Sequence, residues 1–512
     1  MDTLNKKGVQ GDKIFWISVA FTAVFSVWSL IDPIGLTSTL WAWVYDFHGV
    51  FSWFTIVMPF TFLVICIFFA FSRFGKYKFG GKDATPEFST FSWMGMLFAA
   101  GIGVGLMNFG VAEPLSHFLT SPLGLPGGHS PEAAAQNALN MTMFIWGLPA
   151  WSIYTISALV IGYFTYSRGS KFLPGTPIEE GFKDKKWNKA LGNITNISAA
   201  GAAALTMAAT IGLGVFQIQN GLNAVLGIQF DEGLFASVLV LIFVFLTFAL
   251  PATLPLAKGM KRAGDLNVVI AILILAFVFL AGPTSYFMNT IIGTLGGTFS
   301  QVIPISFNAF PLVEKGWFND WPLTTMIWWV SWTPFVGVFV ARISKGRTIK
   351  EFVLASIFIP TVFLVFWFSI FGGFGLKDTI LGDGAIARFI LDNPDDVYLS
   401  FIMVLQAMPF FQITGPLFIF LIIVFLATGA CSAAISLSMI TSNGSSNAPP
   451  RKTLIWSVIM VTVAFATIAT GTISGVRAIA VFLGIPYTFF LIMQISGFIR
   501  SIRADYKKGV LK

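Results

Sequence analysis

The sequence predicts an all-α membrane protein with about twelve transmembrane helices, and three observations support this fold class. Of its 512 residues, 56% are hydrophobic and only 11% are charged, whereas soluble domains carry roughly a quarter charged residues. Apolar stretches of about twenty residues recur along the chain, each long enough to cross a hydrocarbon core of about 30 Å as a helix. Lys and Arg lie between these stretches, which indicates membrane topology and excludes a nucleic-acid-binding face.

The apolar stretches define the expected spans in chain order. The first stretch follows a short basic segment and has no cleavage site of small residues. We therefore expect a retained transmembrane helix and not a cleaved signal peptide. Two moderately apolar stretches, 286–307 and 397–411, contain Gly, Ser and Gln. We expect these to be amphipathic helices along the outer surface or between bundles. The expected spans are 14–32, 50–72, 91–111, 138–163, 194–216, 233–254, 266–286, 324–341, 353–374, 415–440, 453–472 and 478–499.

The distribution of basic residues predicts the orientation. With a cytoplasmic N-terminus, 27 of the 31 Lys and Arg residues fall in inner segments, and only Lys315, Lys377, Arg388 and Arg477 fall in outer ones. One missed helix would invert every later loop, so this asymmetry supports the span count. We therefore expect a multi-pass protein of the cytoplasmic membrane with both termini in the cytoplasm.

The sequence offers little support for a disulfide, a metal site or an enzyme. Cys66 and Cys431 lie inside apolar stretches, so neither a disulfide nor a metal cluster is implied. His48, His117 and His129 are expected in outer loops without metal-ligand spacing. An enzyme is therefore not expected. A membrane sensor is a distant alternative, because no soluble output domain is visible.

Two helix breaks are expected inside apolar spans, where unwound backbone exposes amides and carbonyls to a solute. Gly101, Gly103 and Gly105 alternate in the third span; close helix packing through small residues is the alternative. Pro334 follows Trp328, Trp329 and Trp332 in the eighth span and removes a helix donor. An interfacial tryptophan belt fits poorly there, because Arg342 marks the cytoplasmic end well over a turn away.

The fourth span adds Trp146, Trp151 and Tyr154, which share roughly one helical face if the helix is distorted at Pro149. Aromatic faces with few carboxylates are typical of a site for a quaternary ammonium ion, which has no N–H donor and is held by cation–π attraction. Core packing remains an alternative in a chain that is 16% aromatic.

Four segments in the same order resemble the betaine/carnitine/choline transporter family over about residues 86–496. They are Pro86-Glu87-Phe88-Ser89, the glycine run ending in Ala112-Glu113-Pro114, the Trp146 to Tyr154 segment, and Trp328 through Ala341-Arg342-Ile343-Ser344-Lys345-Gly346-Arg347-Thr348. The resemblance implies two inverted five-helix repeats preceded by two extra helices, and a homotrimer in the lipid bilayer. The expected segments are 1–85 with the two extra helices, 86–286 and 324–500 as the repeats, 287–323 as an outer connection and 501–512 as a cytoplasmic tail.

The resemblance also implies roles for the aromatic residues. Trp146, Trp151, Tyr154 and Trp329 would form an aromatic cage around the ammonium group. Trp328, Trp332 and Phe335 would line the path toward the cytoplasm and help to hold the carboxylate end.

Within the family, the glycine run separates subgroups. Sodium-coupled betaine carriers resemble the pattern of Gly101, Gly103 and Gly105, whereas proton-coupled choline carriers have aspartate at the third glycine. The carnitine antiporter has arginine where Asn267 stands here. The resemblance therefore favours sodium-coupled import of glycine betaine by alternating access; a carrier or exchanger of carnitine, choline or γ-butyrobetaine is the alternative.

Sodium is the one coupling ion expected, with no other cofactor. The resemblance implies a site at Ala99, Ile102, Phe425 and Thr428, but Gly429 replaces a neighbouring hydroxyl residue, so Ser432 or water would have to complete it. A second site is expected near Thr206, Thr210 and Phe335. Ordinary hydrogen bonding between helices is the alternative role for these hydroxyls.

Overall fold

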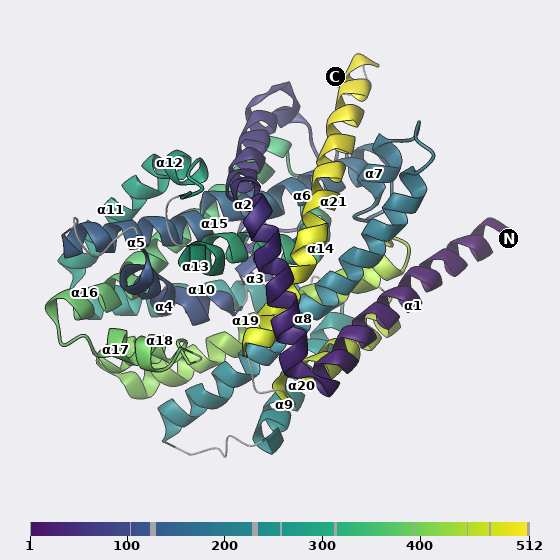
Figure 1. The fold of residues 1–512 in the computed structure, drawn as a ribbon. Coiled ribbons are helices and arrows are strands. Elements are labelled where there is room, and N and C mark those ends of the chain that lie inside the picture. The colour runs from purple at the N-terminus through teal and green to yellow at the C-terminus, as the bar shows by residue number, and fades with distance from the viewer. Residues whose placement is uncertain are drawn as a thin grey trace.

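The computed structural model describes residues 2–102, 104–122, 130–227, 234–255, 259–311, 315–394, 396–447, 449–469 and 473–508. The elements that it contains there are helices (Figure 1). Eleven of them are long and apolar enough to cross a membrane, or twelve if the bent pair α3 and α4 forms one span. This agrees with the expected count of about twelve.

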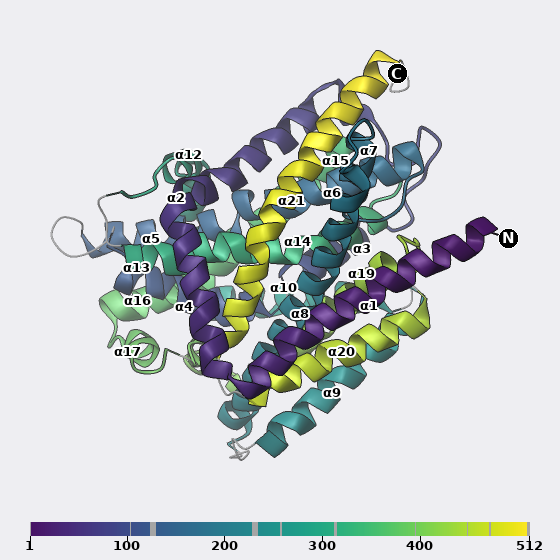
Figure 2. The same ribbon diagram turned by 45° about the vertical axis from the view of Figure 1, so that its right-hand side comes forward.

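Two peripheral helices precede the core. Helix α1 (Asp2–Ile31) packs against α8 and α20, and α2 (Pro33–Phe71) packs along α6 and α21 (Figures 1 and 2). Asp32 separates them, because its carboxylate accepts a hydrogen bond from the Gly35 amide at 2.8 Å and Pro33 begins α2. Helix α2 starts well before the expected residue 50 and changes direction at Phe51.

The core consists of two runs of helices. The first contains α3 (Thr90–Ile102), α4 (Gly105–Thr120), α5 (Pro131–Trp146), α6 (Leu148–Arg168), α7 (Thr176–Gly181), α8 (Asn188–Leu226), α9 (Leu234–Thr253) and α10 (Met260–Ala281). The second contains α14 (Thr324–Ile343), α15 (Ile349–Trp367), η3 (Phe368–Gly372), α16 (Gly373–Leu381), α17 (Ala385–Asp392), α18 (Leu399–Gln406), α19 (Phe411–Thr441), α20 (Pro450–Ala469) and α21 (Ile473–Lys507). Helices α11 (Thr284–Ser300), α12 (Val302–Ser306) and α13 (Lys315–Phe318) and the π-helical turn η2 (Asn319–Leu323) connect them.

Burial separates the centre of the bundle from its lipid-facing rim. The most apolar windows of α8 and α14 are 94% buried, whereas those of α9 and α10 are 33% buried. A helix that is apolar all round yet exposed on one side faces lipid in a membrane protein, and the central helices form the region where polar groups can be placed. The expected amphipathic stretches are helical: α11 packs against α5, and α18 packs against α4.

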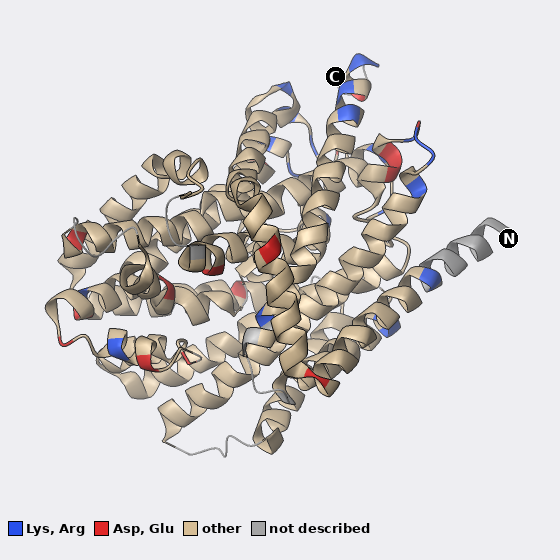
Figure 3. Cartoon of the chain, viewed as in Figure 1, with Lys and Arg blue, Asp and Glu red and all other residues tan. Residues whose placement is uncertain are grey.

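The charged residues gather unevenly along the bundle. Many of the Lys and Arg residues lie at the side where α1 begins and α21 ends (Figure 3). We call this side, which contains Arg73, Arg168, Arg342 and Arg347, the basic end. Its assignment to the cytoplasm stays a prediction, as do the repeat boundaries.

The helix breaks correct two expectations. The fourth span breaks at Gly147, whose backbone angles are φ −92° and ψ −132°, and Pro149 lies in the first turn of the next helix. The expected break at Pro334 is wrong, because α14 continues through this residue. Membrane helices tolerate proline where neighbouring helices pack against them, and here α14 packs against α6, α21 and α8. The third span does break, with α3 and α4 bent by 64°.

Candidate functional site

Four aromatic side chains from three helices, α5, α6 and α14, meet at the centre of the bundle. The ring of Trp329 on α14 lies 5.4 Å from that of Trp146, 6.2 Å from that of Trp151 and 5.0 Å from that of Tyr154, measured between centroids. Trp151 and Tyr154 are themselves perpendicular at 5.9 Å. All four side chains are buried. The break at Gly147 places Trp146 on α5 and the other two on α6, so that their rings converge on Trp329.

The glycine bend gives these rings the space they occupy. A Cβ atom at Gly101 would lie 2.8 Å from Cη2 of Trp151 and 3.3 Å from Cε2 of Tyr154, and one at Gly105 would lie 3.1 Å from Cη2 of Trp146. Each contact is tighter than ordinary van der Waals packing. The two glycines therefore let the aromatic rings approach the bent backbone, which is a more specific role than helix packing alone. Gly103 lies outside the described residues.

A small cavity remains among these rings. Its volume is about 30 Å³, room for about two water molecules. A trimethylammonium group has three methyl groups, each about as large as a water molecule, so the rings must move apart to admit it. The cavity is lined by Gly101, Ile102, Gly105, Trp146, Tyr154, Thr325, Trp328, Trp329 and Trp332.

Phe335 does not line this cavity. Its ring packs against that of Trp332 at 5.5 Å and is fully buried. Its backbone carbonyl accepts a hydrogen bond from the Ser436 hydroxyl at 3.0 Å. In this conformation Phe335 is one layer behind the rings that surround the cavity.

A carboxylate holds one of the cage residues, which the sequence did not predict. The expected third span, 91–111, ends before Glu113 and leaves it in an outer segment, but Glu113 lies within α4 and is 1% exposed. The Trp146 indole N–H donates to Glu113 Oε2 at 2.6 Å, and His117 Nε2 lies 3.4 Å from Oε1. A buried carboxylate requires such partners. The pattern Ala112-Glu113-Pro114 at the end of the glycine run was the available signal.

The histidines also correct an expectation. His48 lies inside α2 and His117 inside α4, and both are buried instead of lying in outer loops. His129 lies outside the described residues. In the described part of the chain, no group of three His, Cys, Asp or Glu side chains is arranged to hold a metal ion.

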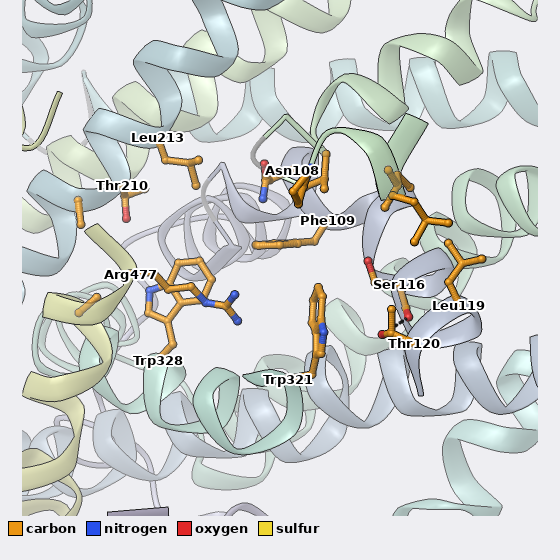
Figure 4. Close-up of a pocket in the computed structure, with 16 residues that line it drawn as sticks. Asn108, Phe109, Ser116, Leu119, Thr120, Thr210, Leu213, Trp321, Trp328 and Arg477 are labelled. Atoms are coloured by element: carbon orange, nitrogen blue, oxygen red, sulfur yellow. Dashed lines mark hydrogen bonds between the residues drawn. The ribbon is translucent and has the colours of Figure 1, made fainter. Parts of the chain in front are cut away.

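A larger cavity lies on the side of the aromatic cluster away from the basic end. Its volume is about 310 Å³, and we call it the vestibule. Trp328 lines both the vestibule and the small cavity, so the two are neighbours. Figure 4 shows Phe109, Trp321 and Trp328 around the vestibule, with the Arg477 guanidinium extending into it. Phe109 lies 6.1 Å from Trp328 and 6.2 Å from Trp321.

The predicted sodium residues lie around α19, behind the bend. The Thr428 hydroxyl donates to the Phe425 carbonyl at 3.0 Å and accepts from the Asn267 amide at 2.8 Å. Asn267 is fully buried, and its Oδ1 has no hydrogen-bond partner among the described residues. Oxygen ligands of this kind suit a small hard cation.

Gly429 leaves room for the hydroxyl that it lacks. A Cβ atom there would meet only Cε of Met207, at 3.7 Å. Ser432 does not replace the missing hydroxyl in this conformation, because it donates to the Gly429 carbonyl at 2.8 Å. Ala99 and Ile102 lie in the last turn of α3, which packs against α19.

The second predicted set lies on α8, which packs against α14. Thr210 donates its hydroxyl proton to the Thr206 carbonyl at 2.9 Å and lines the vestibule. The Thr206 hydroxyl is buried without a hydrogen-bond partner among the described residues. The Phe335 carbonyl already accepts the Ser436 hydroxyl.

Two of the sequence motifs meet at the basic end. Phe79 donates its amide to the Arg347 carbonyl at 2.9 Å, and the Gly346 amide donates to the Phe79 carbonyl at 2.8 Å. Gly346 has φ +82°, and a Cβ there would fall 2.3 Å from the Thr85 carbonyl carbon, so only glycine fits. Arg342 Nη1 pairs with Glu87 at 2.7 Å.

Comparisons with known proteins agree with this architecture. A central broken helix within a bundle of about twelve membrane-spanning helices defines a membrane transport protein. The chain belongs to the betaine/carnitine/choline family of transporters (BCCT), whose pattern matches residues 13–507.

Several characterised relatives are similar over most of the chain. A glycine betaine transporter of Acinetobacter baylyi is 34% identical over 498 residues, covering 97% of this chain and 74% of the relative. The glycine betaine transporter OpuD of Bacillus subtilis is 33% identical, covering 97% and 96%. The high-affinity choline transport protein of Escherichia coli is 32% identical, covering 97% and 72%.

Proposed function

We propose that this chain is a secondary transporter that imports a small quaternary-ammonium solute, with glycine betaine favoured, by alternating access coupled to sodium. The observation that carries the proposal is the position of Trp329, whose ring lies within 6.2 Å of three other buried aromatic rings beside the glycine bend. A cation without N–H donors is attracted to such ring faces by about 0.5 to 2 kcal/mol per ring.

The preference for glycine betaine rests on two further features. Gly105 stands where the choline carriers of the family have an aspartate, and its Cβ-free backbone lies against Trp146. Relatives named as glycine betaine transporters are 33% and 34% identical to this chain. A relative named for choline is 32% identical, so choline is the second candidate solute.

Sodium is proposed as the coupling ion. The Thr428 hydroxyl, the Asn267 amide oxygen and backbone carbonyls near Ala99, Ile102 and Phe425 would hold it, and its gradient would drive uptake. The asparagine oxygen, which is buried without a partner, offers the ligand that Gly429 does not. Completion of the proposed site by water or by Ser432 is therefore not required.

Uptake into proteoliposomes tests the proposed function. Labelled glycine betaine, choline and carnitine are offered with and without an inward sodium gradient. We expect betaine to accumulate with the gradient and to fall to the protein-free level without it. Equal uptake in both conditions would contradict sodium coupling. No uptake of any of the three solutes would contradict the proposal that the substrate is a quaternary-ammonium solute.

Gly429→Ser tests the sodium site. The added hydroxyl fits, because only Met207 approaches the new Cβ, at 3.7 Å. One additional oxygen ligand is worth about 1 kcal/mol, so the sodium concentration for half-maximal uptake should fall about fivefold. Ser432→Ala is the matched control and should leave it unchanged. A Gly429→Ser variant with unchanged sodium dependence would place the ion elsewhere.

A further inference from the structure

The vestibule contains one charged side chain among the described residues that line it. That residue is Arg477, in the first turns of α21. The remaining lining is largely aromatic and aliphatic, with a few amide and hydroxyl groups. The sequence assigned Arg477 to an outer loop, where an arginine would be solvated. Its position against a cavity of about 310 Å³ requires a different explanation.

Arg477 is held in place by a backbone carbonyl and two aromatic rings. One amino group donates to the Asp320 backbone carbonyl at 3.0 Å, and the guanidinium lies 5.7 Å from the ring of Trp321 and 5.8 Å from that of Trp328. Its Nε atom is buried and has no hydrogen-bond partner in the described part of the chain. The ion pairs between described residues do not include Arg477. A partly buried guanidinium in this state favours an anionic ligand.

The nearby carboxylates are engaged elsewhere. Glu113 and Asp320 are close enough to act on the charge of Arg477. Glu113 accepts the Trp146 indole and contacts His117, and Asp320 accepts the Tyr45 hydroxyl at 2.7 Å. Neither lines the vestibule. Their acceptor atoms are thus directed to other donors, while the guanidinium extends into the cavity (Figure 4).

We propose that Arg477 forms an outer subsite that binds the carboxylate of a zwitterionic solute and discriminates against solutes that carry only a positive charge. The subsite rests on the proposed function and adds to it a reason for selectivity. A carboxylate at Arg477 places the attached trimethylammonium group beside the faces of Phe109 and Trp328, and Trp328 leads to the small cavity. A cationic solute such as choline would meet the like charge of the guanidinium and has no carboxylate of its own to pair with it.

Arg477→Gln tests the subsite in proteoliposomes that contain the full chain. Two quantities are measured: the KM for labelled glycine betaine and the inhibition constant of unlabelled choline against it. Loss of the guanidinium should raise the betaine KM at least fivefold and lower the choline inhibition constant at least twofold. The ratio of the choline inhibition constant to the betaine KM should therefore fall at least tenfold. Arg388→Gln, an exposed arginine on α17 outside the vestibule lining, is the control and should leave the ratio unchanged.

Arg477→Lys keeps the charge but loses the planar guanidinium. Its betaine KM should rise about threefold while choline inhibition stays at the wild-type level. This variant carries the test if Arg477→Gln does not fold, and an unchanged betaine KM in it would then overturn the subsite. If the wild type takes up betaine and a folded Arg477→Gln variant keeps the wild-type ratio of the choline inhibition constant to the betaine KM, the subsite alone is overturned. Absence of betaine and choline uptake by the wild type would overturn the proposed function and the subsite together.

Discussion

The two ends of the bundle are held by different kinds of contact. At the basic end, residues 77–90 and 342–351 are distant in sequence and are joined by backbone hydrogen bonds, an ion pair and the Arg347 guanidinium. At the other end, Phe109, Trp321 and Trp328 surround a vestibule of about 310 Å³ through edge-to-face ring contacts. One end is thus joined by directional polar bonds, and the other is lined by aromatic rings in edge-to-face contact.

This difference bears on alternating access. Opening the basic end would exchange polar bonds for water, and each exchange changes the free energy by only about 0.5 to 1.5 kcal/mol. Closing the vestibule would bury aromatic surface without breaking a comparable set of bonds. A solute needs to shift such an equilibrium by only a few kcal/mol. Substitutions at each end should therefore have separable effects.

Arg347→Gln should produce the largest effect, by releasing the basic end. Arg347 is 6% exposed. Its amino groups donate to the Phe88 carbonyl at 2.9 Å and the Thr90 hydroxyl at 3.1 Å, and it lies 4.6 Å from the Trp93 ring. Charge-assisted bonds contribute about 1.5 to 3 kcal/mol each. We expect the equilibrium between the closed and the open basic end to shift toward the open state by about 3 kcal/mol, or roughly a hundredfold.

The opening of the basic end can be measured by the reactivity of a cysteine introduced as Ser157→Cys. Ser157 is buried on α6 and faces Gly337 of α14, between the aromatic cluster and the basic end. Its reaction with a maleimide added at the basic end should accelerate strongly in Arg347→Gln. Arg503→Gln, an exposed arginine at the same end, should not change the rate. An equal rate in all three proteins would show that Arg347 does not fasten this end.

Trp329→Leu should produce the next largest effect, at the aromatic cluster. Loss of one desolvated cation–π contact is worth about 2 kcal/mol, so glycine betaine affinity should fall at least tenfold. The dissociation constant can be measured by calorimetry in detergent. Trp43→Leu is the control, because Trp43 is 50% exposed on the outside of α2. Equal betaine affinity in Trp329→Leu and the wild type would remove Trp329 from the site.

The sequence predicted the parts of this arrangement that are locally encoded. Hydropathy gave the order of the spans, and helical spacing placed Trp146, Trp151 and Tyr154 near one face. The Gly101 to Gly105 run predicted the bend between α3 and α4. Each of these signals depends on residues close together in the chain.

The parts that were missed depend on distant contacts. Glu113 and Arg477 were assigned to outer segments because charged residues normally mark loops, yet partners from other helices make their burial possible. The break expected at Pro334 does not occur, since α14 is packed on several sides. The ion pair of Glu87 with Arg342 likewise could not be predicted from either motif alone.

Gly101→Ala tests whether the rings depend on the bend. The new Cβ would lie 2.8 Å from Trp151, and relieving this contact should cost about 1 to 3 kcal/mol. We expect about a tenfold increase in the betaine dissociation constant. Gly296→Ala is the matched control, because nothing lies within 4 Å of its Cβ. If both variants bind like the wild type, the ring positions are set by contacts other than the glycine.

The Glu87 and Arg342 pair should produce the smallest effect. The two side chains are 39% and 16% exposed, and partly solvated pairs contribute about 0.2 to 1 kcal/mol. A double-mutant cycle of Glu87→Gln and Arg342→Gln, read by the Ser157 cysteine reaction, should give a coupling of at most about fivefold. Arg342 also receives the Tyr166 hydroxyl at its carbonyl, which the substitution leaves intact. A coupling as large as the effect of Arg347→Gln would mean that the ion pair, and not the buried guanidinium of Arg347, is the main contact that keeps the basic end closed.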